Sequence, residues 1–254
     1  MSSGDKPYFF VKSVDKVFRV IETLAKKRYV SLGELASEVQ MTKSNVHRLL
    51  LTLNHLGYVG LSHDGKQYTL SYKLFSLGSS IPSRQALVNE AYPSMEKLSK
   101  ISRETINLGI LFEDMVLYLE KIPSPEALRI DQQVGKFDPC YCTALGKALL
   151  ANLDTGALDE YLERQKPLKA YTKNTITDPQ RLIEVLEEVR TQGYAIDREE
   201  VIEGVCCIGA PLLKDGEAVA AISISGPRMR MTDQRIQELI PYLLEYVGEV
   251  SDRL

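Results

Sequence analysis

Three stretches in the second half of this 254-residue chain combine polar side chains with apolar surroundings, as ligand-binding sites do. In residues 141–147, Thr143 is placed to cap a helix, so that the amides of Ala144 and Leu145 point out of its start. Such a start attracts anions through free N–H groups and the positive end of the helix dipole. A capped start is usually only a cap, so this stretch alone predicts no more than a candidate site.

The other two stretches supply carboxyl, thiol and hydroxyl groups. Residues 194–200 are typical of a short strand with an acidic cluster that includes Asp197. Cys207 lies in a later apolar strand, and Ser223 and Ser225 lie in the strand after it. Each stretch alone is a weak indication of a site, and a solvated acidic loop is the ordinary alternative for the acidic cluster.

An enzyme that used these groups would need a general base, and the second half of the chain offers no histidine for that role. The three histidines, His47, His55 and His63, all lie near the start of the chain, so a cysteine nucleophile in the second half has no histidine partner. Glu199 and Glu200 are adjacent and therefore diverge, and the chain has no glycine-rich phosphate-binding loop. We expect the protein not to be an enzyme.

The stretch from Ser31 to Leu53 predicts two short helices joined by a tight turn. Apolar residues recur at helical spacing in both halves, at Leu32, Leu35, Ala36 and Val39 and again at Val46, Leu49, Leu50 and Leu53. Ser31 and Glu34 have the spacing of a capping box, and Thr42 is placed to cap the second helix. So short a connection between two helices is typical of a helix-turn-helix.

The second of these helices turns a polar face away from its apolar stripe. Short donors at a helix start, followed by a histidine and an arginine, suit base edges and phosphates in a DNA major groove. The candidate DNA contacts are Thr42, Lys43, Ser44, Asn45, His47 and Arg48. An ordinary amphipathic helix with a solvated polar face is the alternative.

Composition and charge favour the DNA interpretation. Hydrophobic content of 44% and charged content of 26% are typical of soluble globular protein, and no membrane span or secretory signal is evident. Residues 1–80 hold 11 Lys and Arg against 6 Asp and Glu, whereas the remainder holds 20 against 28. A basic front on an acidic body localises the attraction to phosphate at one end of the chain. We expect a cytoplasmic protein of two domains with reduced cysteines.

The four cysteines allow an alternative, a metal-sensing regulator. Thiolates suit Zn²⁺, and Cys140, Cys142, Cys206 and Cys207 form a C-x-C and a C-C pair. The spacings differ from those of zinc fingers, and adjacent cysteines on a strand point to opposite faces. Because free cysteine is also a common small core residue, we expect no metal and no other cofactor.

The first domain is expected to be a winged helix-turn-helix. Ser13 is placed to cap a first helix, which ends in the basic run Lys26–Arg28 and packs on the two later helices. Two strands flank the hairpin signal Asp64-Gly65 and form the wing, whose tip carries Lys66. Lys66 is a further candidate contact to DNA, with a solvated turn as the alternative.

The second domain is expected to combine an antiparallel sheet with helices. Residues 71–83 predict a linker helix whose apolar stripe contacts a partner protomer, and a longer helix follows from Arg84 to about Ser102. Strands are predicted at residues 105–112, 115–122, 129–130, 194–200, 205–213 and 217–225, and helices at 143–152, 155–163, 178–192 and 232–250. The fold class is therefore α+β, with a winged helix-turn-helix in residues 1–70, the linker in 71–83 and a GAF- or PAS-like antiparallel-sheet effector domain in 84–254.

The hairpin that precedes Ser223 gives a test of the candidate site. A two-residue turn at Asp215-Gly216 pairs Ile208 with Ser223 and turns Cys207 to the other face of the sheet. A three-residue loop, Lys214–Gly216, pairs Cys207 with Ser223, so that Cys207 and the two serines line one pocket. We expect the three-residue loop.

Over nearly its whole length the chain resembles the isocitrate-lyase-regulator (IclR) family of bacterial transcription factors. The matching segments are SVDKVFRVIETL, SNVHRLL, LGYV and YTLSYKLFSLG in the first half, and CTALGKALLA, GYAIDREEVIEGVCCIGAP and AAISISGP in the second. The resemblance implies an N-terminal winged helix that binds operator DNA and a C-terminal domain that binds a small effector. It also implies dimers of DNA-binding domains, often assembled as tetramers.

Carried over by position, the resemblance implies effector contacts through the backbone amides of Ala144 and Leu145. It implies further contacts at Asp197, Cys207, Ser223 and Ser225. We therefore expect a ligand-responsive regulator of a catabolic operon that acts as a repressor. Its expected partners are double-stranded operator DNA, a small carboxylic or sugar acid, and further copies of itself.

Overall fold

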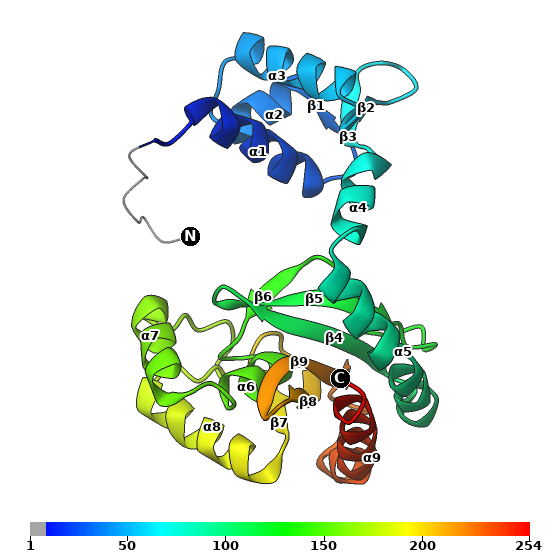
Figure 1. Ribbon diagram of the computed structural model, residues 1–254, viewed down its shortest axis with the longest axis vertical. Coiled ribbons are helices and arrows are strands. Elements are labelled where there is room, and N and C mark those ends of the chain that lie inside the picture. Colours follow the sequence, from blue (N-terminus) through cyan, green and yellow to red (C-terminus); the bar gives the residue numbers. More distant parts are fainter. Residues whose placement is uncertain (1–8) are drawn as a thin grey trace. The chain divides into compact units, whose positions relative to one another are not determined.

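The computed structural model describes residues 9–254, apart from the side chains of residues 82–84. The chain divides into two compact units, Met1–Gln85 and Ala86–Leu254 (Figure 1). No helix in the described part of the chain is long and apolar enough to cross a membrane.

The first unit is a helical domain with a small three-stranded sheet. Its elements are α1 (Lys12–Ala25), β1 (Val30–Ser31), α2 (Leu32–Glu38), α3 (Lys43–His55), β2 (Val59–Leu61), β3 (Gln67–Leu70) and α4 (Tyr72–Ser79). Strand β3 lies between β1 and β2 and pairs antiparallel with both. Helices α1, α2 and α3 pack on the sheet around one apolar core that includes Val20, Leu35 and Leu50. This is a winged helix-turn-helix, as the sequence predicts.

Details of the first unit differ from the sequence prediction. Helix α1 begins at Lys12 after Val11, so Ser13 lies inside the helix and does not cap it. The basic run Lys26–Arg28 follows the helix rather than forming its last turn. Strand β1 has no counterpart among the predicted elements, because it is only two residues long. Its Val30 is fully buried and pairs with Tyr68.

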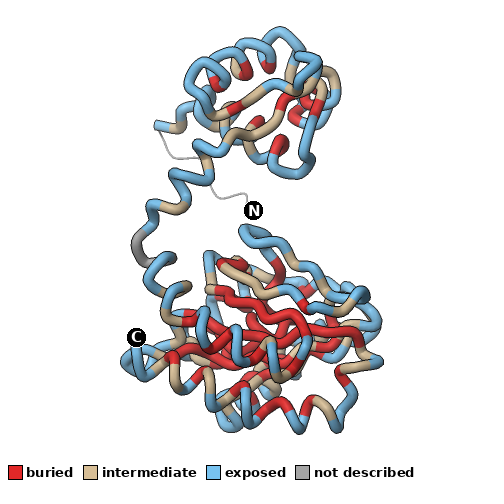
Figure 2. The backbone as a smooth tube through the Cα atoms, turned by 90° about the vertical axis from the view of Figure 1, so that its right-hand side faces the viewer, coloured by how far each residue is buried: buried red, intermediate tan, exposed pale blue. Residues whose placement is uncertain are grey.

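The second unit is built on a six-stranded antiparallel sheet with helices on both faces (Figure 1). Its elements are α5 (Pro82–Ser102), β4 (Thr105–Phe112), β5 (Met115–Ile122), β6 (Phe137–Pro139), α6 (Ala144–Leu150), α7 (Thr155–Gln165), α8 (Pro179–Gln192), β7 (Ala195–Arg198), β8 (Val205–Lys214), β9 (Glu217–Pro227) and α9 (Asp233–Ser251). The strand order is β6-β5-β4-β9-β8-β7. Helices α5 and α9 cover one face and α6, α7 and α8 the other, each with its own apolar core. Figure 2 shows buried residues concentrated in this sheet.

Local sequence signals account for several element ends in this unit. Thr143 and Asp178 cap α6 and α8 with side-chain oxygens that accept hydrogen bonds from backbone amides of the first turn. Gly193 ends α8 with a φ of 82°, a left-handed conformation that glycine adopts without steric cost. The linker prediction is less accurate, because α5 already begins at Pro82, a residue favoured in the first turn of a helix.

The expected strand at residues 129–130 is wrong. The edge strand is β6, and its residues 137–139 pair with residues 115–117 of β5. Residues 129–130 lie in the loop between β5 and β6, where the carbonyl of Ile130 accepts a hydrogen bond from the Thr105 hydroxyl at 2.7 Å. A side-chain contact therefore holds this segment in place of a strand ladder.

The turn between β8 and β9 contains two residues, not the three that we predicted. Lys214 pairs with Glu217, and Asp215 and Gly216 form the turn with φ values of 52° and 85°. Positive φ at both positions is typical of the type I′ turn, which matches the twist of paired strands.

A bulge further along the hairpin changes the register of β8 and β9. The pairing shifts between Leu212 and Leu213, and Val219 is the extra residue on β9. Beyond it, Ile208 pairs with Ile224, and Cys207 pairs with Ser225. The predicted pairing of Cys207 with Ser223 is therefore wrong. Cys207 nevertheless lies on the same face of the sheet as Ser223 and Ser225, as we predicted, because the bulge shifts the register by one residue.

Candidate functional site

The polar face of α3 is exposed in the first unit. Val46 and Leu50 hold the opposite side of the helix in the core. Thr42 caps α3 through a hydroxyl oxygen that accepts from the amide of Asn45 at 3.4 Å, and Gln40, with a φ of 54°, forms the turn after α2. All seven residues predicted to contact DNA are exposed, namely Thr42, Lys43, Ser44, Asn45, His47, Arg48 and Lys66.

A groove lies between α1 and α3. Its lining residues are Ser13, Lys16, Asn45, Arg48, Leu49 and Thr52. The sequence prediction did not include Lys16, which adds a second cation beside Arg48. A phosphate or base edge in this groove meets two positive charges and the Asn45 amide, the donor types that DNA-binding helices use.

Asp64 organises the tip of the wing. Its carboxylate accepts hydrogen bonds from the Ser62 hydroxyl at 2.5 Å and from the amide of Lys66 at 3.2 Å. The Ser62 hydroxyl and then the Lys66 amide lower the pKa of Asp64. Asp64 is therefore ionised near neutral pH, and it holds the tip in the conformation that exposes Lys66.

A band of polar residues crosses the sheet face that α6 covers. Asp197 on β7 pairs with Cys207 on β8, which pairs with Ser225 on β9. Ser223, two residues before Ser225 on β9, pairs with Asn107 on β4. Alternate residues of a strand share a face, so these side chains all lie on the α6 side of the sheet.

Asn107 sets the direction of the two serine hydroxyls. Its Nδ2 donates to Oγ of Ser223 at 3.3 Å and to Oγ of Ser225 at 3.1 Å. Each serine thus accepts from Asn107 and keeps its own hydrogen for another acceptor. Asn107 is buried, and its Oδ1 has no hydrogen-bond partner among the described residues. Ser225 also hydrogen-bonds the Cys207 side chain, so Ser223 is the serine whose hydrogen remains available to a ligand in front of the sheet.

Helix α6 starts directly over this band. The Thr143 hydroxyl accepts from the amide of Gly146 at 3.1 Å, while the amides of Ala144 and Leu145 have no acceptor within the helix. Gly209 of β8 permits the close approach, because a Cβ there would lie 3.0 Å from the carbonyl of Ala144. The positive end of the helix dipole is therefore close to the polar band.

A cavity of about 30 Å³, partly open to solvent, lies at this junction. It is lined by Tyr118, Ile130, Gln132, Asp138, Thr143, Ala144, Leu145, Asp197, Val201, Ile202, Val205, Cys207, Ser223 and Ser225. All six residues predicted to contact an effector are among them, so the fold brings them together. Their part in binding stays a prediction.

The sequence prediction missed three polar residues of the same cavity, Tyr118, Gln132 and Asp138. Asp138 is buried in β6, and its Oδ2 accepts from Nε2 of Gln132 at 2.5 Å. Burial and the neighbouring Asp138 raise the pKa of Tyr118, so its hydroxyl is neutral and can donate. The available signal was a charged residue directly before Pro139-Cys140. The misplaced strand at residues 129–130 concealed it.

A buried ion pair lies beside the cavity and holds Asp197 in place. Nζ of Lys147 donates to the carbonyl of Ile196 at 2.6 Å and pairs with the carboxylate of Glu200. These side chains are only 1% and 7% exposed. The amide of Glu200 donates to Oδ1 of Asp197 at 2.7 Å. Lys147 therefore fixes the end of β7 so that Asp197 lines the cavity.

Asp197 has an unusual protonation equilibrium. Burial raises the pKa of Asp197 to about 7, against the opposing hydrogen bond from the Glu200 amide. The charges of Glu200 and Asp138 raise this pKa further, whereas Lys147 lowers it. Near neutral pH, Asp197 can therefore either donate or accept a hydrogen bond from a ligand.

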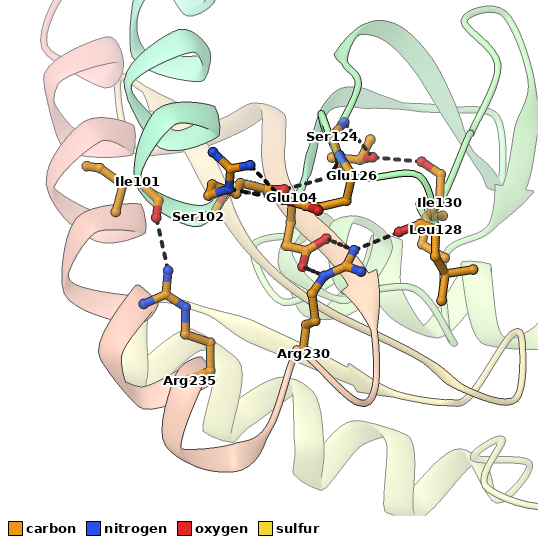
Figure 3. A network of polar contacts seen from close by, with 11 residues as sticks. Ile101, Ser102, Glu104, Ser124, Glu126, Leu128, Ile130, Arg230 and Arg235 are labelled. Carbon is orange, nitrogen blue, oxygen red and sulfur yellow. Dashed lines mark hydrogen bonds and ion pairs between the residues drawn. The ribbon is translucent and has the colours of Figure 1, made fainter.

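The loop between β5 and β6 forms one rim of the cavity and contributes Ile130 and Gln132. Figure 3 shows the contacts that fix the outer side of this loop. Arg230 forms a two-pronged ion pair with Glu104 and donates to the carbonyl of Leu128 at 2.8 Å. Because Glu104 is only 3% exposed, this ion pair anchors the rim to the sheet.

The four cysteines do not converge on one point. Cys206 lies in the core under α5 and α9, Cys140 and Cys142 lie in the core on the other side of the sheet, and Cys207 faces the cavity. Residues 9–254 contain no group of three or more His, Cys, Asp or Glu that could hold a metal ion. Burial raises the pKa of Cys206 to about 11, which favours the thiol over the thiolate that metals bind. The metal-sensing alternative gains no support in this part of the chain.

Comparison with known proteins assigns both units. The profile described as "IclR helix-turn-helix domain" matches residues 13–61, and "Bacterial transcriptional regulator IclR C-terminal" matches residues 80–252. The HTH-type transcriptional regulator KdgR of Escherichia coli K12 is 38% identical over 251 residues, covering 98% of this chain and 95% of KdgR. The transcriptional repressor IclR of the same organism is 31% identical over 245 residues, covering 95% and 89%. The crystal structure of Thermotoga maritima IclR has a TM-score of 0.80 at 32% identity, covering 96% of this chain and 98% of that one. The chain is therefore a member of the IclR family of bacterial transcriptional regulators.

Proposed function

We propose that the protein represses a catabolic operon by binding operator DNA through α3 and the wing, under the control of a small organic or sugar acid. The observation that carries this proposal is the convergence of six residues from α6, β7, β8 and β9 on one cavity beside a capped helix start. Helix-start amides and serine hydroxyls are the donors that bind a carboxylate.

The DNA contacts divide into base-reading and phosphate-binding groups. Arg48 and Asn45, on the exposed face of α3, have the side chains that pair with guanine and adenine edges in the major groove. Lys43 at the helix start and Lys66 at the wing tip supply charge to phosphates, which fixes the protein on the duplex. His47 contributes a donor beside Arg48.

The effector occupies the cavity with its carboxylate at the start of α6. The amides of Ala144 and Leu145 and the hydroxyl of Ser223 donate to this carboxylate. Asp197, with a pKa near 7, hydrogen-bonds a hydroxyl or keto group of the acid. The apolar wall, which includes Val201 and Val205, covers the carbon chain.

DNA control requires that the effector bind one arrangement of the protomers better than another, because a ligand shifts an equilibrium only through differential affinity. The operator-binding form is a dimer, with two α3 helices about 34 Å apart on successive turns of a pseudo-palindrome. Tyr72 and Phe75 of α4 are 90% and 70% exposed, and this apolar surface supports contact with a partner protomer. Residues 71–83 connect the two units and transmit the change.

Two variants test whether DNA binding and acid binding depend on different residues. Arg48→Ala should weaken binding to DNA selected by the protein from a random library about 10–100-fold, and it should leave acid affinity unchanged. Asp197→Ala should abolish the response of DNA binding to the acid and leave DNA affinity without the acid unchanged. Gel-shift titration and calorimetry with a panel of carboxylic and sugar acids measure both. If either folded variant loses both activities, the proposal is wrong.

A further inference from the structure

The polar band ends in a carboxyl group at both edges of the sheet. Asp197 belongs to the edge strand β7 and Asp138 to the opposite edge strand β6. Both nevertheless line the same cavity. The sheet therefore curls enough to bring its two edges to one cavity, where the charge of Asp138 acts on Asp197.

Asp138 is held in a defined position by neighbouring polar groups, some of which also line the cavity. Its Oδ2 accepts from Gln132 at 2.5 Å, and Nζ of the exposed Lys136 lies 3.6 Å from its Oδ1. The Asp138 side chain is 9% exposed, so its carboxylate is largely shielded from water. The Tyr118 hydroxyl also hydrogen-bonds Asp138. A buried carboxylate costs free energy unless hydrogen bonds satisfy it, and its two oxygens have room for one further donor beside these neighbours.

The cavity thus has a donor side and an acceptor side. The donor side consists of the α6 amides and the hydroxyl of Ser223, whose hydrogen Asn107 leaves free. The acceptor side consists of the Asp138 carboxylate, to which the Tyr118 hydroxyl and the Gln132 amide already donate. A ligand that matches both sides carries one carboxylate and, at its other end, a hydroxyl group that can donate.

We infer that Asp138 determines effector specificity: it accepts a hydrogen bond from a terminal hydroxyl of a polyhydroxy monocarboxylate and repels a second carboxylate at that position. The inference rests on the proposed function, since it names the residue that contacts the end of the proposed effector opposite its carboxylate. Charge repulsion between two carboxylates in a water-poor site is strong, because little solvent screens it. A dicarboxylate of the same length is therefore excluded by Asp138, and an acid without hydroxyls donates no hydrogen bond to it.

Gluconate, glucarate and hexanoate are matched probes for this test. Gluconate and glucarate share six carbons and four internal hydroxyls and differ only in the terminal group, whereas hexanoate has no hydroxyls. For the unsubstituted full-length protein, calorimetry should rank gluconate at least about 30-fold above both glucarate and hexanoate. The pentose-derived pair, an aldonate and its aldarate, extends the panel to a shorter chain.

Asp138→Asn should invert part of this ranking, because the amide keeps the shape and removes the charge. Gluconate affinity should fall about 10-fold, and glucarate affinity should rise about 10-fold or more. A variant that merely damaged the cavity would weaken both. Asp159→Asn, on the exposed surface of α7, makes the same chemical change far from the cavity and should alter neither affinity. Asp138→Ser, smaller and neutral, replaces Asp138→Asn if that variant does not fold.

The outcomes separate this inference from the proposed function. The inference is overturned, and acid sensing left intact, by either of two results. One is that the unsubstituted protein prefers glucarate or hexanoate, and the other is that folded Asp138 variants keep the same ratio of gluconate to glucarate affinity. Absence of binding by every acid of the panel overturns both. Gluconate preference that is lost with Asp138 and retained in Asp159→Asn supports the inference.

Discussion

The proposed DNA-reading face and the proposed effector cavity are assembled in opposite ways. Six of the seven candidate DNA contacts come from one run of the chain, residues 42–48, and all of them are exposed on one short helix and its cap. The cavity draws its 14 lining residues from positions 118 to 225, on five strands, one helix and the loops between them. One site depends on local helix geometry, whereas the other depends on strand register across a whole sheet. Damage should therefore remain local in the first unit and spread in the second.

The largest effect is expected from Lys147→Met in the buried ion pair. Removing the ammonium leaves the Glu200 carboxylate buried and unpaired, which should lower the free energy of unfolding by about 3–5 kcal/mol. Chemical denaturation measures this loss, and hydrogen exchange resolved by peptide should locate it in the second unit. The double variant Lys147→Met/Glu200→Gln removes both charges and should recover at least half of the loss. Equal loss of protection in α1–α3 would contradict the contrast between the two regions.

The next effect concerns Asp197 and pH. Its pKa is about 7 in the folded protein, above the usual value of about 3.9 in an unfolded chain. Asp197 therefore does not affect the free energy of unfolding below about pH 4. It lowers this free energy increasingly as pH rises from about 4 to 7, and the effect is constant above that. Between pH 5 and pH 8, the unsubstituted protein should lose about 2–3 kcal/mol more stability than Asp197→Asn.

Urea unfolding at the two pH values checks this difference. Glu200, Asp138 and Lys147 all act on Asp197, and they remain in both proteins, so subtraction isolates the Asp197 carboxyl. Parallel curves for the two proteins would show that Asp197 is ionised throughout this range.

A smaller effect is expected at Asn45 on the recognition helix. Asn45→Ala should reduce affinity for selected DNA about 10–100-fold and relax the base preference at one position of each half-site. Thr42 accepts from the backbone amide of residue 45, which alanine retains, so the helix cap should be unaffected. Binding to a library randomised at single positions provides the measurement. Uniform weakening over all sequences would instead assign Asn45 to a phosphate.

The smallest effect is expected at the wing tip. Lys66→Ala should weaken DNA binding by less than about 10-fold, and the slope of log affinity against log salt should become shallower by about 1. Affinity measured at three or more salt concentrations gives this slope. Lys169→Ala is a matched control, since Lys169 belongs to the second unit and lies over the ring of Tyr171. An unchanged slope in Lys66→Ala would remove the wing from the DNA contact surface.

The same contrast explains what the sequence could predict. Helix α3 could be delineated because its signals are local: the Thr42 cap, the helical spacing of Val46 and Leu50, and the short turn before them. For the same reason, the hairpin of β4 and β5 was predicted with the bounds that the structure has. Each of these features depends on residues within a few positions of one another.

The cavity could be predicted only in part, because strand register is a long-range property. The family resemblance implied six of its lining residues, and all six meet. No local pattern indicated the bulge at Val219, since the surrounding stretch is apolar on both faces. The loop before β6 likewise shows no alternation, and it is held from far along the chain by Arg230, which donates to the carbonyl of Leu128. Asp138, which follows this loop, was missed for that reason.

The bulge at Val219 also separates the tip of the β8–β9 hairpin from the residues that line the cavity. Asp215 and Gly216 at the tip are exposed, and the register of Cys207 and Ser225 is set beyond the bulge. Exposed hairpin tips are sites where proteins tolerate insertions. A fluorescent domain inserted between Asp215 and Gly216 would leave the residues that line the cavity in place. The hairpin thereby offers a natural attachment point for turning this protein into an optical biosensor of its own effector.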